Sequence, residues 1–564
     1  MTDEIKHECA VALVVLRKGC DHYCAKFGAV DFGGTKLSLL LEKQHNRGQD
    51  GAGAAIVEAN PVPGEEPYWL AKSASATPLA DVLAAIGKRE RNRTVERIFL
   101  GHLRYATFGK NETSFCHPFV HEAGDLAHTV LLAGNFNLTN AHELFEDYSR
   151  RGAFPTSKAD GYLICELIAR ELDKEGLQGS DFQHQGNAQP IARALSSALA
   201  NADGAWTLCG ATGDGWAFAT RDAHGIRPGF YYFDDDVIVV ASERPAIQAA
   251  FDVPPEAVKE LPCGEAIVVS PGGEVQMVEL CSTKPPKRSC CFERIYFSRA
   301  NDADIHRERK ALGAALLPQI LKAADAPMED IFFSYIPNSA RIAFHGLLEE
   351  LIKNAFHHNA SFPRFGEIAV KDAKFRTFIA DASARREFYK HVYDVTYGLV
   401  RPGKDTLVVL DDSIVRGNTM KNAILPMLDR LGPKRIVIAS SAPPIRYPDC
   451  YGIDMSTLGE LVAFKALVNL LGEEAAEALR STSLAELYAR FTDERHCAEI
   501  ARLLTPPGMR AEVVVVYQTV ENMRKCLGVS GDWYFTGDYP TPGGYKVLHK
   551  ALMNYLNKNS ERSY

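Results

Sequence analysis

The sequence predicts an α/β protein, and three features of one stretch support that fold class. Residues 407–410 (LVVL) form an uninterrupted apolar run, which is typical of a parallel strand buried on both faces. Apolar residues then recur at helical spacing from Ala423 to Leu431, and Gly432-Pro433 supplies a stop for that helix. A second strand-like run, 435–438 (RIVI), follows. Strand, helix and strand in this order indicate a parallel sheet with helices on both faces.

Length and one linker indicate more than one domain. A chain of 564 residues, 46% of them hydrophobic, can bury several cores, and its length suggests two to four domains. The basic, proline-bearing segment 282–288 (STKPPKR) follows the strand-like run 264–269 and is the best candidate for a linker. We therefore expect one domain over 9–285 and a second over 286–564, with a helix-rich, charged segment at 472–510 in its C-terminal extension.

Composition excludes several classes of partner. The net charge of −8 gives no basic surface for nucleic acid. Thirteen scattered cysteines, an odd number, indicate reduced thiols and so a cytoplasmic protein. The apolar run 10–16 is too short to span a bilayer, so no membrane partner is expected. Residues 1–8 are polar and resemble no targeting segment, and we interpret them as a propeptide.

Two adjacent carboxylates, Asp411 and Asp412, come directly after the predicted strand 407–410. They would lie at the carboxyl end of that strand, where open α/β sheets bind ligands. Such a pair can accept hydrogen bonds from a ribose diol and can hold Mg²⁺ directly or through water, because this cation prefers oxygen ligands and keeps part of its hydration shell.

A hydroxyl-glycine loop follows the two acids. Ser413, Thr419 and the backbone amides around Gly417 can wrap a phosphate at the start of the next helix, where unpaired N–H groups and the helix dipole favour an anion. A solvated acidic turn is the alternative, but strand, acid pair, loop and helix all agree on a ligand site. The predicted ligand is a phosphorylated ribose that carries pyrophosphate.

Cys9 is a candidate nucleophile close to the start of the chain. Removal of residues 1–8 would make it the amino-terminal residue. Its thiol could then attack an amide while its own α-amino group, with an intrinsic pKa of roughly 8, moves the proton. The alternative is a small buried hydrophobic residue at the start of a strand, which is the commoner fate of a single cysteine.

The segment 411–419 (DDSIVRGNT) resembles the phosphoribosyl pyrophosphate (PRPP) loop of type I phosphoribosyltransferases, and its full form is similar to that of the glutamine PRPP amidotransferases, or amidophosphoribosyltransferases. That family carries a glutamine-hydrolysing domain, with a cysteine near its start, ahead of the PRPP domain. The resemblance runs from Cys9 to about Leu471. It implies an N-terminal-nucleophile glutaminase domain with α/β/β/α layers, followed by a parallel-sheet type I phosphoribosyltransferase domain.

Six ordered segments carry the resemblance in the first half, namely 44–53, 101–107, 134–140, 157–160, 221–228 and 241–243. By resemblance, Cys9 is the catalytic nucleophile and Asn135 donates to the oxyanion through its side-chain amide. Arg104 holds the glutamine α-carboxylate and Asp160 its α-amino group, with arginine suited to bidentate pairing. Phe136, in the glutamine-binding segment, stands where the family usually has glycine, but its backbone N–H can still complete the oxyanion hole.

The second half supplies the PRPP and metal residues by resemblance. Ser339, in the segment 336–339, joins Asp411 and Asp412 as a predicted Mg²⁺ ligand. Lys371, Lys374 and Arg376 match a basic loop that meets pyrophosphate, although the spacing is one residue shorter than usual and a solvated loop is the alternative. The predicted PRPP contacts in the loop itself are Asp411, Asp412, Ser413, Val415, Arg416, Gly417, Asn418 and Thr419.

Cysteine positions predict no iron-sulfur cluster. Some relatives hold a cluster with four cysteines, and here Cys290 fits the first place while Cys450 is one residue away from the second. Gly531 and Tyr534 replace the last two thiols, and Cys526 is the one further candidate. A cluster needs four suitable thiolates as a rule. No Cys-x-x-Cys pair offers a zinc site either.

The resemblance implies a pentosyltransferase that converts glutamine, PRPP and water into 5-phosphoribosylamine, glutamate and pyrophosphate, the first step of purine synthesis. Glutamine and PRPP are the expected partners, together with further copies of the chain in a homo-oligomer. A hexosamine-phosphate synthase would lack the loop at 411–419. A regulatory PRPP-binding homologue would release no glutamate, and an inactive scaffolding homologue is kept open by Ala10, Phe136 and the inserted Asn46.

Overall fold

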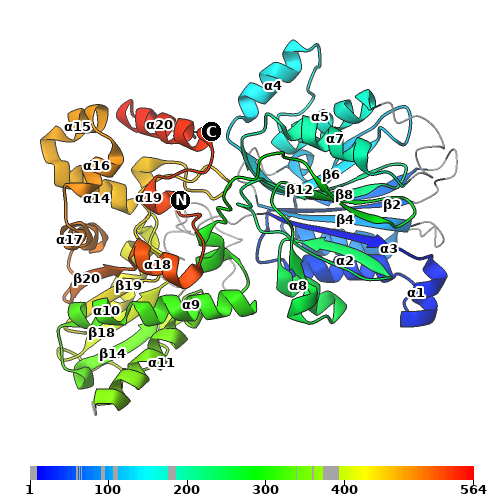
Figure 1. Cartoon of the computed structure of the whole chain (residues 1–564). Coiled ribbons are helices and arrows are strands. Elements are labelled where there is room, and N and C mark those ends of the chain that lie inside the picture. Colours follow the sequence, from blue (N-terminus) through cyan, green and yellow to red (C-terminus); the bar gives the residue numbers. More distant parts are fainter. Residues whose placement is uncertain are drawn as a thin grey trace.

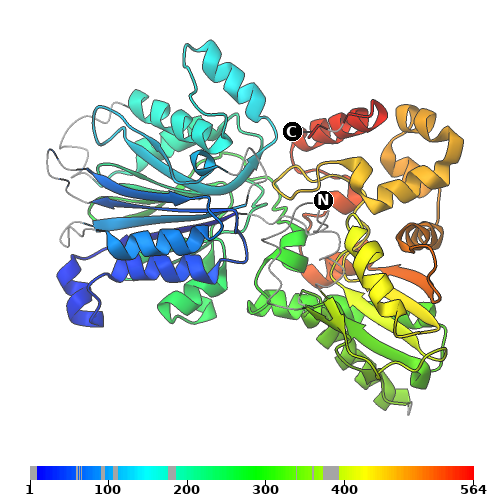
Figure 2. The ribbon, with the colours of Figure 1, turned by 180° about the vertical axis from the view of Figure 1, so that it is seen from behind.

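The computed structural model describes two lobes joined side by side (Figures 1 and 2). The first half of the chain forms one lobe and the second half forms the other. The described residues are 9–58, 61, 64, 66–89, 96–105, 112–175, 186–337, 339–358, 361–371, 393–559 and 561–563.

Two antiparallel sheets form the centre of the N-terminal lobe. The first has seven strands in the order β11(Lys259–Glu260), β9(Phe230–Phe233), β10(Val237–Ala241), β1(Ala10–Leu16), β4(Glu96–Arg104), β2(Gly51–Glu58) and β3(Tyr68–Ser73). The second has six in the order β13(Val275–Glu279), β12(Glu265–Val269), β8(Ala217–Arg221), β7(Gly204–Thr212), β6(Val130–Leu138) and β5(Phe119–His121).

Helices cover the outer face of each sheet. Figure 1 shows α2(Phe32–Lys43), α3(Pro78–Lys88) and α8(Arg244–Phe251) on the first sheet, and α5(Asp160–Lys174) and α7(Gln189–Leu199) on the second. The alternation of strand side chains divides β1 between two cores. Ala12 and Val14 pack against the helices, whereas Val11 and Leu13 pack between the sheets. The predicted α/β/β/α layering of this lobe is confirmed.

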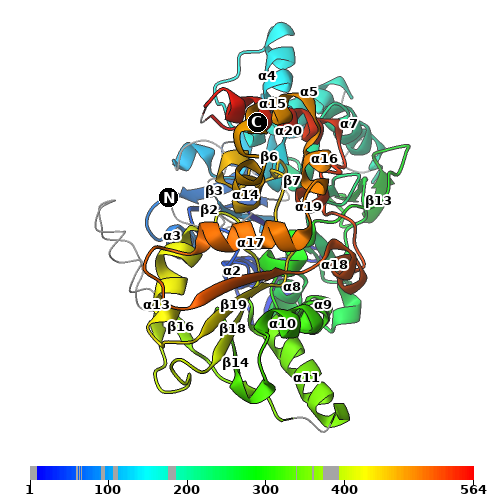
Figure 3. The same ribbon diagram turned by 90° about the vertical axis from the view of Figure 1, so that its left-hand side faces the viewer.

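A five-stranded parallel sheet forms the centre of the C-terminal lobe. Its order is β15(Arg364–Phe365), β14(Ile331–Tyr335), β18(Thr406–Asp411), β19(Arg435–Ser440) and β20(Glu512–Tyr517). One face packs on α10(Leu317–Ala324) and α11(Arg341–His358), with α9(Ala303–Ala315) lying against α11. The other face packs on α13(Leu425–Asp429), α14(Val462–Leu471) and α17(Asp493–Leu504) (Figure 3). The predicted parallel sheet with helices on both faces is confirmed.

The strand, helix and strand expected around 407–438 are present as β18, α13 and β19, with one change. The helix begins as a π-helical segment, η5(Met420–Ile424), and only then becomes the α-helix α13. Gly432 adopts a positive φ of 69° directly after this helix, which explains why glycine stands there. The expected helix-rich segment is also present, as η7(Gly472–Glu474), α15(Ala475–Ser481), α16(Leu484–Ala489) and α17.

The remaining elements are short or peripheral. They are α1(Cys20–Phe27), η1(Thr113–Phe115), α4(Ala141–Arg150), η2(Pro255–Ala257), η3(Glu293–Phe297), η4(Met328–Asp330), β16(Ala369–Lys371), β17(Tyr393–Val395), η6(Leu458–Glu460), α18(Val520–Leu527), α19(Trp533–Thr536) and α20(Pro542–Leu556). Within the described chain, no helix combines the length and the apolar character that crossing a bilayer requires.

Hydrogen bonds tie the two lobes together. The side chain of Asn137 on β6 donates to the carbonyl of Cys450 in the second lobe at 2.7 Å. Asp203 accepts from the Thr541 hydroxyl at 2.5 Å and from the Gly543 N–H at 2.8 Å, and so caps the start of α20 from the other lobe. The boundary expected between 285 and 286 falls in a stretch without helix or strand, and it stays a prediction.

Candidate active sites

A pocket in the N-terminal lobe gathers most of the residues predicted to bind glutamine. Cys9 lies directly before β1, Arg104 ends β4, Phe136 lies on β6 and Asp160 begins α5. The pocket encloses about 390 Å³, including space open to solvent. Its lining is Cys9, Arg104, Tyr105, Phe115, His117, Phe119, Gly134, Phe136, Ala159 and Asp160.

The thiol of Cys9 is held by one backbone segment. Its Sγ accepts from the Tyr105 N–H at 3.4 Å and donates weakly to the Tyr105 carbonyl at 3.8 Å. Burial raises the pKa of the Cys9 thiol to about 11. The thiol is therefore protonated at neutral pH and needs a nearby base to become a nucleophile.

Arg104 and Asp160 place opposite charges on the pocket wall. Burial raises the pKa of Asp160 to about 6, and the Gly161 N–H, 2.9 Å from its Oδ1, and the charge of Arg104 oppose that rise. Asp160 is thus ionised at neutral pH. The guanidinium of Arg104 lies 5.6 Å from the centre of the Phe115 ring. One cation and one anion in the same pocket suit the carboxylate and ammonium groups of a free amino acid.

Asn135 is buried, with 2% of its surface exposed, between the pocket-lining residues Gly134 and Phe136. Its Nδ2 has no hydrogen-bond partner among the described residues. An unpaired buried donor costs free energy, roughly 1–3 kcal/mol, so this amide is available to bind a ligand or a transition state. The bulk of Phe136 is accommodated against His117, whose ring centre is 5.6 Å away.

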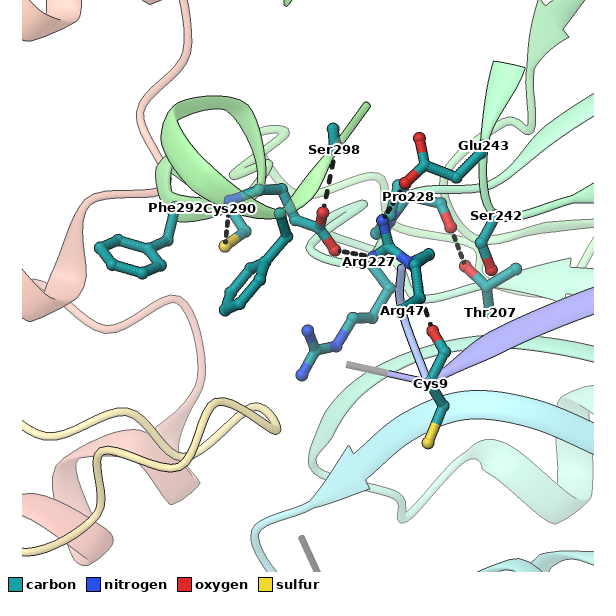
Figure 4. Close-up of polar contacts among 12 residues, drawn as sticks. Cys9, Arg47, Thr207, Arg227, Pro228, Ser242, Glu243, Cys290, Phe292 and Ser298 are labelled. Atoms are coloured by element: carbon teal, nitrogen blue, oxygen red, sulfur yellow. Dashed lines mark hydrogen bonds and ion pairs between the residues drawn. The ribbon is translucent and has the colours of Figure 1, made fainter. Parts of the chain in front are cut away.

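A buried ion-pair cluster connects Cys9 with the second lobe (Figure 4). Arg47 donates from Nε to the Cys9 carbonyl at 3.4 Å and pairs with Glu243 of the first lobe at 2.8 Å. It also pairs with Glu293 in η3 of the second lobe. Asn46, the residue inserted relative to the family pattern, donates to the Phe297 carbonyl of the same helix at 3.4 Å. The backbone of the predicted nucleophile is therefore fixed by contacts that include both lobes.

The second predicted site lies at the carboxyl end of β18. Ser339 donates from Oγ to Oδ1 of Asp412 at 2.6 Å, and the Asp412 N–H donates to Oδ1 of Asp411 at 2.9 Å. Burial raises the pKa of Asp412, while the Ser339 hydrogen bond and the charge of Arg309 oppose that rise. Ser413 contacts the same carboxylate at 3.3 Å. The structure thus brings together the three residues predicted to bind Mg²⁺.

In the loop that follows Asp411 and Asp412, the backbone of residues 415–417 is better placed to contact a ligand than their side chains are. Val415 is buried in the core, and its carbonyl accepts from the Val462 N–H at 2.9 Å. Arg416 is paired with Glu460 at 2.7 Å and with Asp454 at 3.4 Å. Gly417 has a φ of 79°, and a Cβ there would come within 2.3 Å of Leu504. Residues 415 to 417 can therefore meet a phosphate through their amides, as the helix-start geometry predicts.

The basic loop is only partly described. Lys374 and Arg376 lie outside the described residues, and of Lys371 only the backbone, at the end of β16, is described. Their predicted contact with pyrophosphate stays a prediction, as do those of Asn418 and Thr419 with PRPP.

The residues fit a magnesium site better than a metal cluster. Across the described part of the chain, no group of three or more His, Cys, Asp or Glu side chains is arranged to hold a metal ion. Mg²⁺ usually binds through one or two carboxylates plus substrate phosphates and keeps several waters, so Asp411 and Asp412 with Ser339 suffice for it.

The donor set does not fit an iron-sulfur cluster. Cys290 Sγ lies 2.9 Å from the hydroxyl of Tyr534, which stands in the place of the fourth thiol. A Cβ at Gly531, the third place, would come within 2.0 Å of the Ser289 carbonyl. A hydroxyl and a glycine replace two of the thiolates that such a cluster requires.

Several residues that line the pocket of Cys9 were not predicted from the sequence. They are Tyr105, Phe115, His117 and Phe119. Tyr105 follows Arg104 in a segment that carries the family resemblance. It contacts the Cys9 thiol through its backbone N–H and carbonyl, and a backbone contact cannot be predicted from the residue type. His117 had a weaker signal, a histidine before Pro118 in an otherwise apolar run, and that pattern fits many loops.

Fold and sites together define a glutaminase domain of the N-terminal-nucleophile type joined to a type I phosphoribosyltransferase domain. No family model matches the chain. An amidophosphoribosyltransferase of Escherichia coli is 30% identical over 442 residues, which cover 75% of this chain and 79% of the relative. One of Staphylococcus aureus is 27% identical over 548 residues, or 96% and 95% of the two chains. The chain belongs to the amidophosphoribosyltransferase family.

Solved structures agree on the fold. The glutamine PRPP amidotransferase of Bacillus subtilis, complexed with ADP and GMP, superposes with a TM-score of 0.66 at 24% identity and covers 94% of this chain and 97% of its own. A second structure, of the allosteric regulatory enzyme of purine biosynthesis, gives the same TM-score and identity.

Proposed function

We propose that two sites in this chain divide the reaction of its family between them. That reaction is the amidophosphoribosyltransferase reaction, in which glutamine, PRPP and water give 5-phosphoribosylamine, glutamate and pyrophosphate, the first step of purine synthesis. The observation that carries the proposal is the single pocket that holds Cys9, Arg104 and Asp160 together, on the same chain as the acid pair Asp411 and Asp412.

Glutamine would be hydrolysed in the N-terminal pocket. Arg104 pairs with its α-carboxylate and Asp160 with its α-ammonium group. The Cys9 sulfur adds to the side-chain amide carbon while the thiol proton passes to the α-amino group of Cys9, freed by loss of residues 1–8. Asn135 Nδ2 and the Phe136 N–H donate to the oxyanion. The proton then leaves with the amide nitrogen as ammonia, and water hydrolyses the thioester to glutamate.

The pKa of the thiol explains why a terminal amine is needed. A thiol with a pKa of about 11 holds its proton at neutral pH, because burial raises the pKa more than the charges of Arg104 and Arg47 lower it. An α-amino group has an intrinsic pKa of roughly 8, so it can accept the proton within the same residue. The amine and the nucleophile then form one catalytic unit.

PRPP would react in the second lobe. The ribose diol is accepted by Asp411 and Asp412, and the 5-phosphate by the amides and hydroxyls of residues 413–419. Ammonia forms a bond to C1 of the ribose as the bond from C1 to the pyrophosphate oxygen breaks, and the nitrogen loses a proton. Orientation of the two reactants supplies much of the rate, because the site holds them in one geometry.

Mg²⁺ is the proposed metal, with Asp411, Asp412 and Ser339 as the residues that would hold it. When bound, the ion neutralises charge on the departing pyrophosphate. Lys371, Lys374 and Arg376 would meet the same group from the basic loop.

Several general properties accompany this proposal. All thirteen cysteines are free thiols, which suits a reducing, cytoplasmic compartment. The net charge of −8 suits small-molecule substrates and no nucleic acid. We also propose assembly into a homo-oligomer. A purely regulatory PRPP-binding homologue is not favoured, because it would have no use for a pocket that keeps a thiol, an arginine and an aspartate together.

Processing at Cys9 is the first expected result. The mass of the purified, active protein should be lower than that of the full chain by the mass of residues 1–8, and terminal sequencing should begin at Cys9. The reason is that the proposed proton acceptor exists only after cleavage. A fully active protein that still carries Met1 at its start would contradict the terminal-nucleophile mechanism.

A further inference from the structure

The strand that carries Asn135 has an unusual edge. Strand β5 pairs with β6 only from Phe119 opposite Leu132 to His121 opposite Val130. Further along this edge of β6, at Gly134, two histidine side chains make the hydrogen bonds that a continued β5 would make. The Gly134 N–H donates to Nδ1 of His117 at 3.2 Å, and Nε2 of His102 lies 3.1 Å from the Gly134 carbonyl.

These contacts fix the tautomers of the two rings, here called the histidine pair. His117 accepts at Nδ1, so its proton is on Nε2, and His102 must donate from Nε2 to the carbonyl. Burial lowers the pKa of His102 to about 3 and holds that of His117 well below its ordinary value. Both rings are therefore neutral, which allows them to stack with centres 4.0 Å apart and planes 9° from parallel.

The same edge carries the second oxyanion donor. Backbone N–H groups of a strand point alternately to its two sides, so Gly134 and Phe136 share one side while Asn135 faces β7. The N–H and carbonyl of Gly134 face the histidine pair, so the N–H of Phe136 also points to this edge of β6. Gly134 and Phe136 both line the pocket of Cys9. The position of Gly134 therefore sets the direction of the Phe136 amide and of the Asn135 side chain.

We propose that His117, supported by His102, is a positioning residue for glutamine hydrolysis, which holds the Gly134 peptide so that Asn135 and the Phe136 N–H face the oxyanion. The inference rests on the proposed function of Cys9 and deepens it. His117 touches the strand and not the reacting atoms, so its effect passes through the two donors.

Packing around His117 supports this assignment. Its ring centre lies 5.6 Å from that of Phe136 and 4.7 Å from that of Phe119. A Cβ at Gly134 would come within 2.4 Å of Leu208 and 2.8 Å of Phe136, so only glycine fits at this position without a shift of these neighbours. The bulky residue that stands where the family usually has glycine is thus held in place by a ring that also binds the backbone beside it.

Two substitutions separate the hydrogen bond from the packing. His117→Phe keeps an aromatic ring but removes the acceptor for the Gly134 N–H. His117→Asn loses the ring but places an amide oxygen near the position of Nδ1. We expect kcat for glutamine-dependent 5-phosphoribosylamine formation to fall on the order of 10 to 100-fold in His117→Phe, since loss of one oxyanion donor costs about 10² to 10³-fold. The glutamine KM should change by less than about 3-fold, because Arg104 and Asp160 are untouched.

The conservative variant and the second reaction serve as controls. His117→Asn should recover kcat to within about 5-fold of wild type, and the ammonia-dependent reaction should be unchanged in both variants. Alkylation of Cys9 by iodoacetamide should proceed at the wild-type rate, which shows that the pocket is formed. Wild-type kcat in His117→Phe, or a kcat in His117→Asn as low as in His117→Phe, would overturn the inference.

¹⁵N NMR spectra test the tautomers of the histidine pair independently of enzyme activity. In protein labelled with ¹⁵N-histidine, both rings should show an unprotonated Nδ1 and a protonated Nε2 at neutral pH, with assignments from His102→Gln and His117→Asn. A protonated Nδ1 in His117 would overturn the inference. Absence of glutamate release by the wild-type protein would instead overturn the proposed function, and the spectra would still decide the geometry.

Discussion

Replacement of Cys9 by alanine is expected to abolish glutamine-dependent 5-phosphoribosylamine formation while sparing the ammonia-dependent reaction. Loss of a catalytic nucleophile typically costs on the order of 10⁴-fold or more in kcat. The proposed PRPP site lies in the other lobe and should accept ammonia from any source, so its rate with added ammonium salt should remain within about 2-fold of wild type. Pyrophosphate release measured with each nitrogen donor gives both rates in one preparation.

A matched control is available in the same lobe. Cys24 on α1 is a partly buried free thiol that does not line the pocket of Cys9, so Cys24→Ala should leave both reactions unchanged. Equal loss of both reactions in Cys9→Ala would contradict the division of labour between the lobes. Retained glutamine-dependent activity would remove Cys9 from the mechanism.

The second large effect is expected from Asp412→Asn, which should reduce both reactions on the order of 100-fold or more. The change keeps the volume of the side chain but removes the negative charge that a divalent cation and a ribose diol require. Asp412 is 6% exposed and accepts the Ser339 hydroxyl at 2.6 Å, so the substitution acts on the site and not on the surface. Rates should be measured over a range of Mg²⁺ and PRPP concentrations with ammonia as the donor.

An exposed acid of the same type provides the control. Asp493 pairs with Arg446 at 3.0 Å with 82% of its side chain exposed, so Asp493→Asn should change neither reaction. Iodoacetamide should still alkylate Cys9 in Asp412→Asn at the wild-type rate, which shows that the first lobe is intact. Normal PRPP turnover in Asp412→Asn would contradict the role given to the acid pair.

The sequence predicted those parts of the fold whose signal is local. The apolar run 407–410 became β18, and Gly432 ends the following helix with the positive φ that only glycine adopts freely. The apolar run and the stop residue are readable without knowledge of what packs against each element.

Other features depend on partners that are distant in the sequence. The contact between Arg47 and Glu293 joins residues 246 positions apart, and no sequence pattern in either segment predicts it. The π-helical start of the helix at Met420 was not predicted, because the apolar spacing that indicates the helix begins only at Ala423. Arg416 was predicted to bind PRPP, but its side chain has acidic neighbours in Asp454 and Glu460 that only the fold supplies.

The same reasoning applies to the candidate sites. Cys9, Arg104 and Asp160 were predicted by resemblance, and the pocket brings them together. His117 and His102 could not be paired from the sequence, because their role follows from the place where β5 stops pairing with β6. A strand edge is a property of the folded sheet, so the side chains that complete it are found only in the structure.

The central claim is that glutamine hydrolysed at Cys9 supplies the nitrogen that reaches PRPP. The most direct measurement uses glutamine labelled with ¹⁵N at the side-chain amide, in the presence of unlabelled ammonium ion at a concentration too low to support the ammonia-dependent reaction, and determines the isotope in the trapped 5-phosphoribosylamine. We expect the product to carry the label with little dilution, because ammonia that passed through bulk water would be protonated and mixed. A product with the isotope content of the bulk ammonium pool would contradict the claim.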